Sequence, residues 1–136
     1  MVTFVELAAI AGERDFSDDA YLSFRACQGT RHPNTVAVLG DLTFDVILRD
    51  SAGQTSSINI GAYGGGVEEP FARTGFGAGT GWQNEFETIR IRLTDFGTND
   101  SGLNLSDVVA LRFEFGPSHG SAQGRIALDD IEITTD

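Results

Sequence analysis

Strand-length segments of alternating apolar and polar residues constrain the fold of this chain most. Residues 42–50, LTFDVILRD, place four large apolar side chains on one face of an extended chain, and residues 103–116, LNLSDVVALRFEFG, do the same. The chain has no long apolar stripe of helical period. The pattern therefore predicts an all-β fold, and a length of 136 residues fits a single domain, residues 1–136.

Gly, Asp and Asn bound about eight segments of strand length. We expect strands within residues 2–8, 20–27, 35–39, 42–50, 56–63, 86–96, 103–116 and 124–136. The RDSAGQ turn between the fourth and fifth segments has the chemistry of a hairpin connection, so these two should pair. Outward-facing Arg90, Arg92, Arg112 and Glu114 are expected to form a solvated cross-strand ladder.

Charge and cysteine content exclude several classes of partner. The net charge is -11 and all nine basic residues are Arg, so we expect repulsion from nucleic acids and anionic membranes. No apolar run reaches 18 residues, which predicts no insertion into a membrane. Cys27 is the only cysteine, so neither an internal disulfide nor a cysteine-based zinc site is possible.

Two adjacent aspartates, Asp129 and Asp130, interrupt the last apolar segment. Ile126 and Leu128 have one parity, whereas the next aliphatic pair, at 131 and 133, has the other, so a regular strand would point the pairs to opposite faces. A β-bulge at the aspartates would return all four side chains to the core, and bulges tolerate residues that strands disfavour.

A second interpretation is that one of these carboxylates binds a cation. Hard cations such as calcium require several oxygen ligands, and carboxylates supply them. The early part of the chain offers further donors, which would lie near the last strand if the first and last strands were neighbours. These early donors are Glu6, Glu13, Asp15, Asp18 and Asp19.

Five segments together resemble a known family. They look like the β-jelly-roll carbohydrate-binding modules that have a galactose-binding-domain-like sandwich. The five segments are DFSDDAYLSFRA, LRDSAGQ, ETIRIRLTDF, LNLSDVVALRFEFG and GRIALDDIEI. The resemblance implies an antiparallel β-sandwich of jelly-roll type. It also implies a structural calcium between the N-terminal region and the closing aspartate, with Asp129 or Asp130 as ligand on one side and Glu6, Glu13 or Asp15 on the other. A sugar site is implied either in the end loops or on a concave sheet face.

The glycine-rich stretch between residues 63 and 84 is the first candidate for a sugar site. Long loops in compact domains are often functional, and sugars need flat rings together with planar polar groups. The candidate ligand-binding residues are Tyr63, Glu68, Phe71, Arg73, Phe76, Trp82 and Asn84. The alternative for Tyr63 and Trp82 is that they cap the core. On a concave sheet face the candidates are Arg25, Arg90, Arg92 and Arg112.

The sequence has few signs of catalysis. Glu85 and Glu87, two apart, are expected on a charged outer face rather than as a pair of catalytic carboxylates. We therefore expect a non-catalytic carbohydrate-binding module with a structural calcium and a polysaccharide or glycan ligand. An extracellular or cell-surface location is expected, with an export signal and further domains outside this chain. The alternatives are an extracellular adhesion or structural module without sugar binding, and a small hydrolase.

Overall fold

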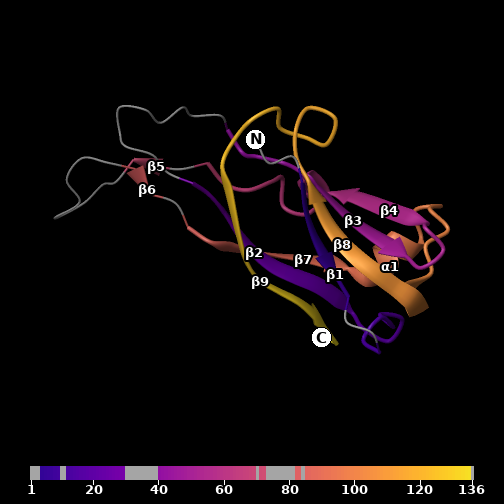
Figure 1. Ribbon diagram of the computed structural model, residues 1–136. Helices are drawn as coiled ribbons and strands as arrows, with labels where there is room; N and C mark the ends of the chain where they lie inside the picture. Colours follow the sequence, from indigo (N-terminus) through magenta and orange to yellow (C-terminus); the bar gives the residue numbers. More distant parts are fainter. Residues whose placement is uncertain are drawn as a thin grey trace.

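The computed structural model describes residues 4–9, 12–29, 40–69, 71–72, 82–83 and 85–135. Two antiparallel sheets form its main body (Figure 1). In order of chain position, the strands are β1 (Phe4–Ala8), β2 (Tyr21–Gln28), β3 (Asp45–Asp50), β4 (Thr55–Asn59), β5 (Phe71–Ala72), β6 (Trp82–Gln83), β7 (Glu87–Arg92), β8 (Val108–Glu114) and β9 (Ile126–Thr134). Three short helical segments are η2 (Ile60–Ala62), α1 (Leu93–Gly97) and η3 (Leu105–Asp107).

The strands divide into a four-stranded sheet and a three-stranded sheet. The first has the order β1-β8-β3-β4 and the second β7-β2-β9, while β5 and β6 form a small separate pair. The predicted class, an antiparallel β-sandwich of jelly-roll type, is confirmed, with seven strands in the two main sheets rather than about eight. The strand expected at 35–39 lies outside the described residues.

The core lies between the two sheets. Leu22, Phe24 and Ala26 of β2 are fully buried, as their alternation predicts. The Phe24 ring meets the Phe113 ring of β8 edge-on, with centroids 5.2 Å apart, and the Phe44 ring lies 6.0 Å from that of Phe113. Such aromatic packing joins the two sheets through a small number of large side chains.

The Asp50 side chain links the predicted hairpin of β3 and β4 to the loop that contains Asn104. This side chain is only 2 % exposed and accepts hydrogen bonds from the backbone N–H groups of Ala52 (3.0 Å), Gln54 (2.9 Å) and Asn104 (2.9 Å). The bond from Asn104 contributes most to lowering the pKa of Asp50. A carboxylate thus replaces backbone pairing where the chain turns.

A β-bulge interrupts the pairing of β2 with β9. Ser23 pairs with Glu132 but Arg25 pairs with Asp129, so Phe24 faces two residues, Asp130 and Ile131. Asp130 has a φ of 49°, in the left-handed region that Asp tolerates better than most residues. The aliphatic side chains that pack against the core are Ile126, Leu128, Ile131 and Ile133. The predicted bulge is confirmed, one residue later in the chain than expected.

Three expectations about strand ends and neighbours were wrong. The segment 86–96 ends as a strand at Arg92, because the chain turns into α1 at Leu93. The segment 56–63 ends as a strand at Asn59, whose side chain accepts a hydrogen bond from the Gly61 N–H and starts the turn of η2, which leaves Ala62 exposed. The expected arginine ladder is also divided, because β7 with Arg90 and Arg92 belongs to the three-stranded sheet and β8 with Arg112 to the other.

Candidate functional site

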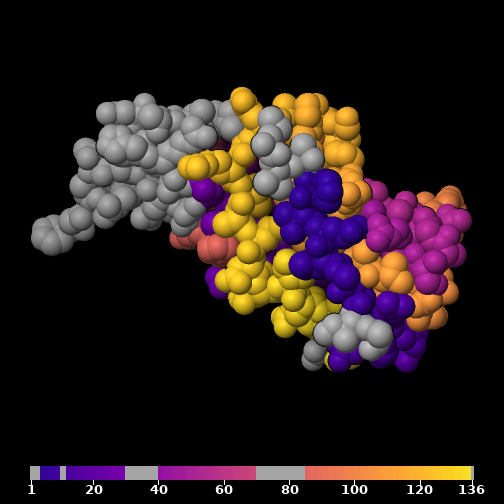
Figure 2. Space-filling view, viewed as in Figure 1, coloured from indigo at the N-terminus to yellow at the C-terminus, as the bar shows by residue number. Residues whose placement is uncertain are grey.

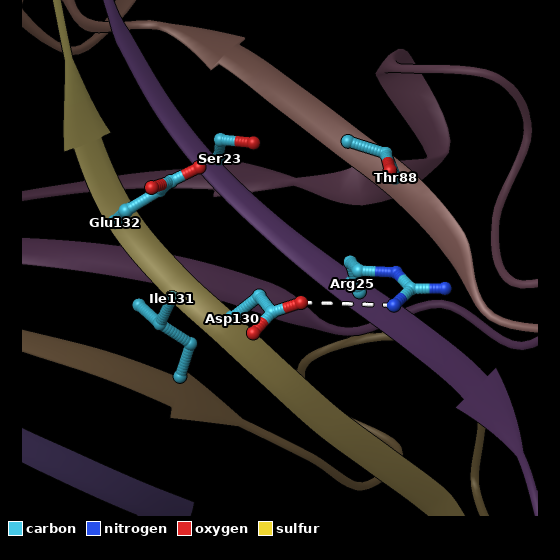
Figure 3. Close-up of a pocket in the computed structure, with 6 residues that line it drawn as sticks. All are labelled: Ser23, Arg25, Thr88, Asp130, Ile131 and Glu132. Carbon is cyan, nitrogen blue, oxygen red and sulfur yellow. Dashed lines mark ion pairs between the residues drawn. The ribbon is translucent and has the colours of Figure 1, made fainter.

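The outer face of the three-stranded sheet carries a polar hollow. Alternate residues of β2, β7 and β9 point away from the core, and the register places Ser23 between Arg90 and Glu132, and Arg25 beside Thr88. The hollow has a volume of about 500 Å³. Its lining residues, drawn in Figure 3, are Ser23, Arg25, Thr88, Asp130, Ile131 and Glu132.

The bulge in β9 sets the position of one wall of this hollow. In Figure 3 the side chains of Arg25 and Asp130 point toward each other from neighbouring strands, and Arg25 Nη1 lies 3.6 Å from Asp130 Oδ2. Their side chains are 45 % and 61 % exposed. Because the ion pair is long and solvated, both groups retain capacity for further hydrogen bonds.

Two aromatic rings accompany the arginines of this face. The Arg90 guanidinium carbon lies 4.2 Å from the centroid of the Tyr21 ring, and the corresponding distance from Arg25 to the Phe86 ring is 5.3 Å. These cation–π contacts restrain the long arginine side chains. Phe86 is 41 % exposed, so an apolar surface lies beside the polar groups.

Donors and acceptors separate into rows on this face. Arg90 and Arg92 stand on β7 at one edge, Asp130 and Glu132 stand on β9 at the other, and Arg25 lies on β2 between them. Guanidinium groups only donate hydrogen bonds and carboxylates only accept them, whereas a hydroxyl does both. The arrangement therefore suits a ligand rich in hydroxyl groups.

The predicted loop site is only partly described. Tyr63 is half-buried against the core and donates a hydrogen bond to the Asp95 carboxylate. Burial, and then this bond, raises the pKa of Tyr63 to about 12. These contacts match the capping alternative for Tyr63. Glu68 is exposed, and its N–H donates to Glu87 Oε1 at 2.6 Å.

The other members of that predicted site lie in or near the small hairpin. Phe71 pairs with Gln83, and Trp82 pairs with Ala72, through the backbones of β5 and β6. Arg73, Phe76 and Asn84 lie outside the described residues. Sugar binding by this stretch stays a prediction.

The five predicted metal ligands are not brought together. Glu6 stands on β1 of the four-stranded sheet and pairs with Arg49 at 2.9 Å, whereas Asp129 and Asp130 belong to β9 of the other sheet. The Asp129 carboxylate accepts from the Asp130 N–H at 2.8 Å.

The remaining two candidates lie in the segment between β1 and β2. Asp15 accepts hydrogen bonds from the backbone N–H and the hydroxyl of Ser17, the latter lowering the pKa of Asp15 most, and Glu13 precedes it. Within the described part of the chain, no three His, Cys, Asp or Glu side chains are arranged to hold a metal ion. Calcium binding by these residues stays a prediction.

His119 lies in the segment GPSHG, residues 116–120, which has the form G-x-S-x-G, but its ring contacts two carboxylates that the sequence did not indicate. Its Nδ1 lies 3.0 Å from Asp45 Oδ2 and its Nε2 lies 3.0 Å from Glu114 Oε2, so each ring nitrogen meets a carboxylate. Arg112 Nη1 lies 2.8 Å from the other oxygen of Glu114. A Ser–His–Asp site requires the imidazole to face a nucleophile, and here both nitrogens are already engaged by carboxylates.

Alternation could have located the outer-face site, because Tyr21, Ser23 and Arg25 have the same parity within one strand. Alternation does not indicate which strands pair with β2 on its two sides.

Comparisons with protein-family models, with curated proteins and with solved structures found no significant match to this chain. No helix in the described ranges is long and apolar enough to span a membrane.

Proposed function

We propose that this chain is a non-catalytic carbohydrate-binding module that holds its ligand on the outer face of β7, β2 and β9. The observation that carries the proposal is the hollow in which Arg25 of β2 stands between the arginine row of β7 and the carboxylate row of β9. A polysaccharide presents vicinal hydroxyl groups that can bond to both rows at once.

The aromatic rings of this face add the second element of sugar recognition. The exposed ring of Phe86 offers an apolar surface for the C–H face of a pyranose. The Arg25 guanidinium, held against that ring, lies where it can donate to a ring oxygen or hydroxyl. Phe86 does not line the hollow itself, but its contact with Arg25 joins an exposed apolar ring to the polar groups that do.

Affinity electrophoresis tests the proposal. The purified chain is run through gels that contain xylan, galactan, mannan, pectin, a soluble cellulose derivative or no polysaccharide. We expect at least one polysaccharide to retard the chain, and Arg25→Ala to reduce that retardation. Unchanged mobility in every gel would contradict sugar binding and favour the alternative of an adhesion or structural module.

A structural calcium and an extracellular or cell-surface location stay predictions that accompany this proposal. The predicted ligands on the two sides of the ion are Asp129 or Asp130 of β9 and Glu6, Glu13 or Asp15 of the early part of the chain. A melting temperature that rises with added calcium and falls with a chelator would support the ion. An unchanged melting temperature would contradict a structural calcium without affecting the proposed sugar site.

A further inference from the structure

A second hollow, of about 980 Å³, opens between the edge strands of the two sheets. Figure 2 shows β1, in indigo, beside β9, in yellow. The apolar walls of this cleft are Val5, Leu42, Phe115, Ile126, Leu128 and Ile131. The volume falls at the upper end of the range for small-molecule sites, and the walls are of the apolar kind that such sites use.

The loop that closes one side of the cleft is firmly attached to the sandwich. The Thr43 N–H donates to Ser121 Oγ at 2.9 Å, and the Ser121 N–H donates back to the Thr43 carbonyl at 3.1 Å. Asn59 Nδ2 donates to the His119 carbonyl at 2.9 Å. A Cβ at Gly120 would lie 2.6 Å from the Thr43 carbonyl oxygen, so this loop approaches the backbone of residue 43 as closely as only glycine allows. The cleft is therefore preformed.

The charge of the cleft differs from that of the whole chain. The chain has 20 acidic residues, yet among the described residues that line the cleft none is acidic and Arg125 is the one with a charge. Arg125 is exposed and forms no ion pair with any described residue. A ligand with an apolar body and an anionic head matches this distribution.

We propose that the cleft binds a long-chain fatty acid. The alkyl chain lies between β1 and β9, where it covers Val5 and Leu128, and the carboxylate accepts hydrogen bonds from Arg125. Burial of methylene groups supplies most of the affinity, since each one removed from water is favourable. Among the described lining residues the cleft shares only Ile131 with the polar hollow, and the proposal does not depend on sugar binding.

Titration calorimetry on the purified chain tests this site with three probes of equal chain length below their micelle concentrations. The probes are dodecanoate, dodecanol and dodecyltrimethylammonium. We expect saturable, one-to-one binding of dodecanoate, weaker binding of dodecanol, and the weakest binding of the cation. Equal affinity for the anion and the cation, or no saturable binding of dodecanoate, would overturn the proposal.

Two variants distinguish the contribution of the ligand's carboxylate from that of its alkyl chain. Arg125→Gln should weaken dodecanoate about tenfold, the usual scale for one charge-assisted hydrogen bond, and leave dodecanol unchanged. Ala122→Trp, in the exposed loop beside the cleft, should abolish binding of both by filling the space. Arg49→Gln makes the same charge change on the outer face of β3 and should have no effect.

Circular dichroism establishes that each variant is folded. If folded Ala122→Trp binds dodecanoate with wild-type affinity, the ligand lies elsewhere and the proposal fails. It also fails if sedimentation shows the chain to be a dimer that Ala122→Trp dissociates, because the cleft would then be an interface between two copies.

Discussion

Arg25 and Asp130 face each other across β2 and β9, with Nη1 and Oδ2 3.6 Å apart, at the bulge that brings the last strand back into register. Exposed ion pairs of this kind contribute about 0–1 kcal/mol to stability. We therefore expect Arg25→Ala to leave the free energy of unfolding within about 1 kcal/mol of wild type in urea denaturation. A larger loss would mean that Arg25 serves the fold rather than a ligand.

The backbone at Asp130 gives a prediction about the bulge itself. Its φ of 49° suits Gly or Asp but not a β-branched residue. Asp130→Val should destabilise the chain by about 1–2 kcal/mol relative to Asp130→Gly, since both variants lose the contact with Arg25 and only Val strains the backbone. Urea unfolding of the two variants measures the difference. Equal stability would mean that β9 can shift its register instead.

The buried carboxylate of Asp50 should make the fold sensitive to acid. Backbone hydrogen bonds, above all the one from Asn104, lower the pKa of Asp50 below its usual value. A carboxyl whose pKa is lower in the folded state stabilises the fold above its unfolded pKa of about 4, and this stability is lost as the pH falls through the folded value.

Melting temperatures between pH 2 and pH 7 measure this effect. The variant Asp50→Asn should melt lower than wild type at pH 7, with the difference shrinking as the pH falls below about 4. Asp107→Asn, in the neighbouring η3 segment, is a matched control for removing one carboxylate. A difference between Asp50→Asn and wild type that stays constant with pH would contradict the role given to the charge.

The contact between Tyr63 and Asp95 predicts a late alkaline titration. Burial and the bond to the Asp95 carboxylate raise the pKa of Tyr63 to about 12. The stability from this contact is fully present below the unfolded pKa of about 10 and is lost as the pH rises through about 12. In a titration of tyrosinate absorbance, Tyr63→Phe should remove the phase near pH 12, and Tyr21→Phe should retain it. If the phase survives in Tyr63→Phe, the contact is not formed in solution.

Local patterns predicted the strands and the bulge because both depend on neighbouring residues. Alternation identified the buried side of β2, and the changed parity between Leu128 and Ile131 required an extra residue in β9. The pattern failed where the structure depends on which strands, distant in the sequence, pair with one another. It placed Arg90 and Arg112 in one ladder, although their strands belong to different sheets.

The candidate site was harder to predict for the same reason. Asp129 and Asp130 drew attention as metal ligands because they are adjacent acids in a strand. Asp130 instead contacts Arg25, and the Asp129 carboxylate accepts a hydrogen bond from the Asp130 N–H. The contact with Arg25 follows from the pairing of β2 with β9. Sequence spacing carries no information about that pairing, because the two strands are separated by most of the chain.

Chemical-shift mapping by NMR tests the central claim most directly. An oligosaccharide from the polysaccharide that retards the chain is titrated into isotope-labelled protein, and the backbone amide shifts are followed. We predict that the largest changes fall on residues 21–25, 88–90 and 130–132. Changes confined to the outer face of β3 and β8, or to residues 63–84, would contradict binding on the face of β7, β2 and β9.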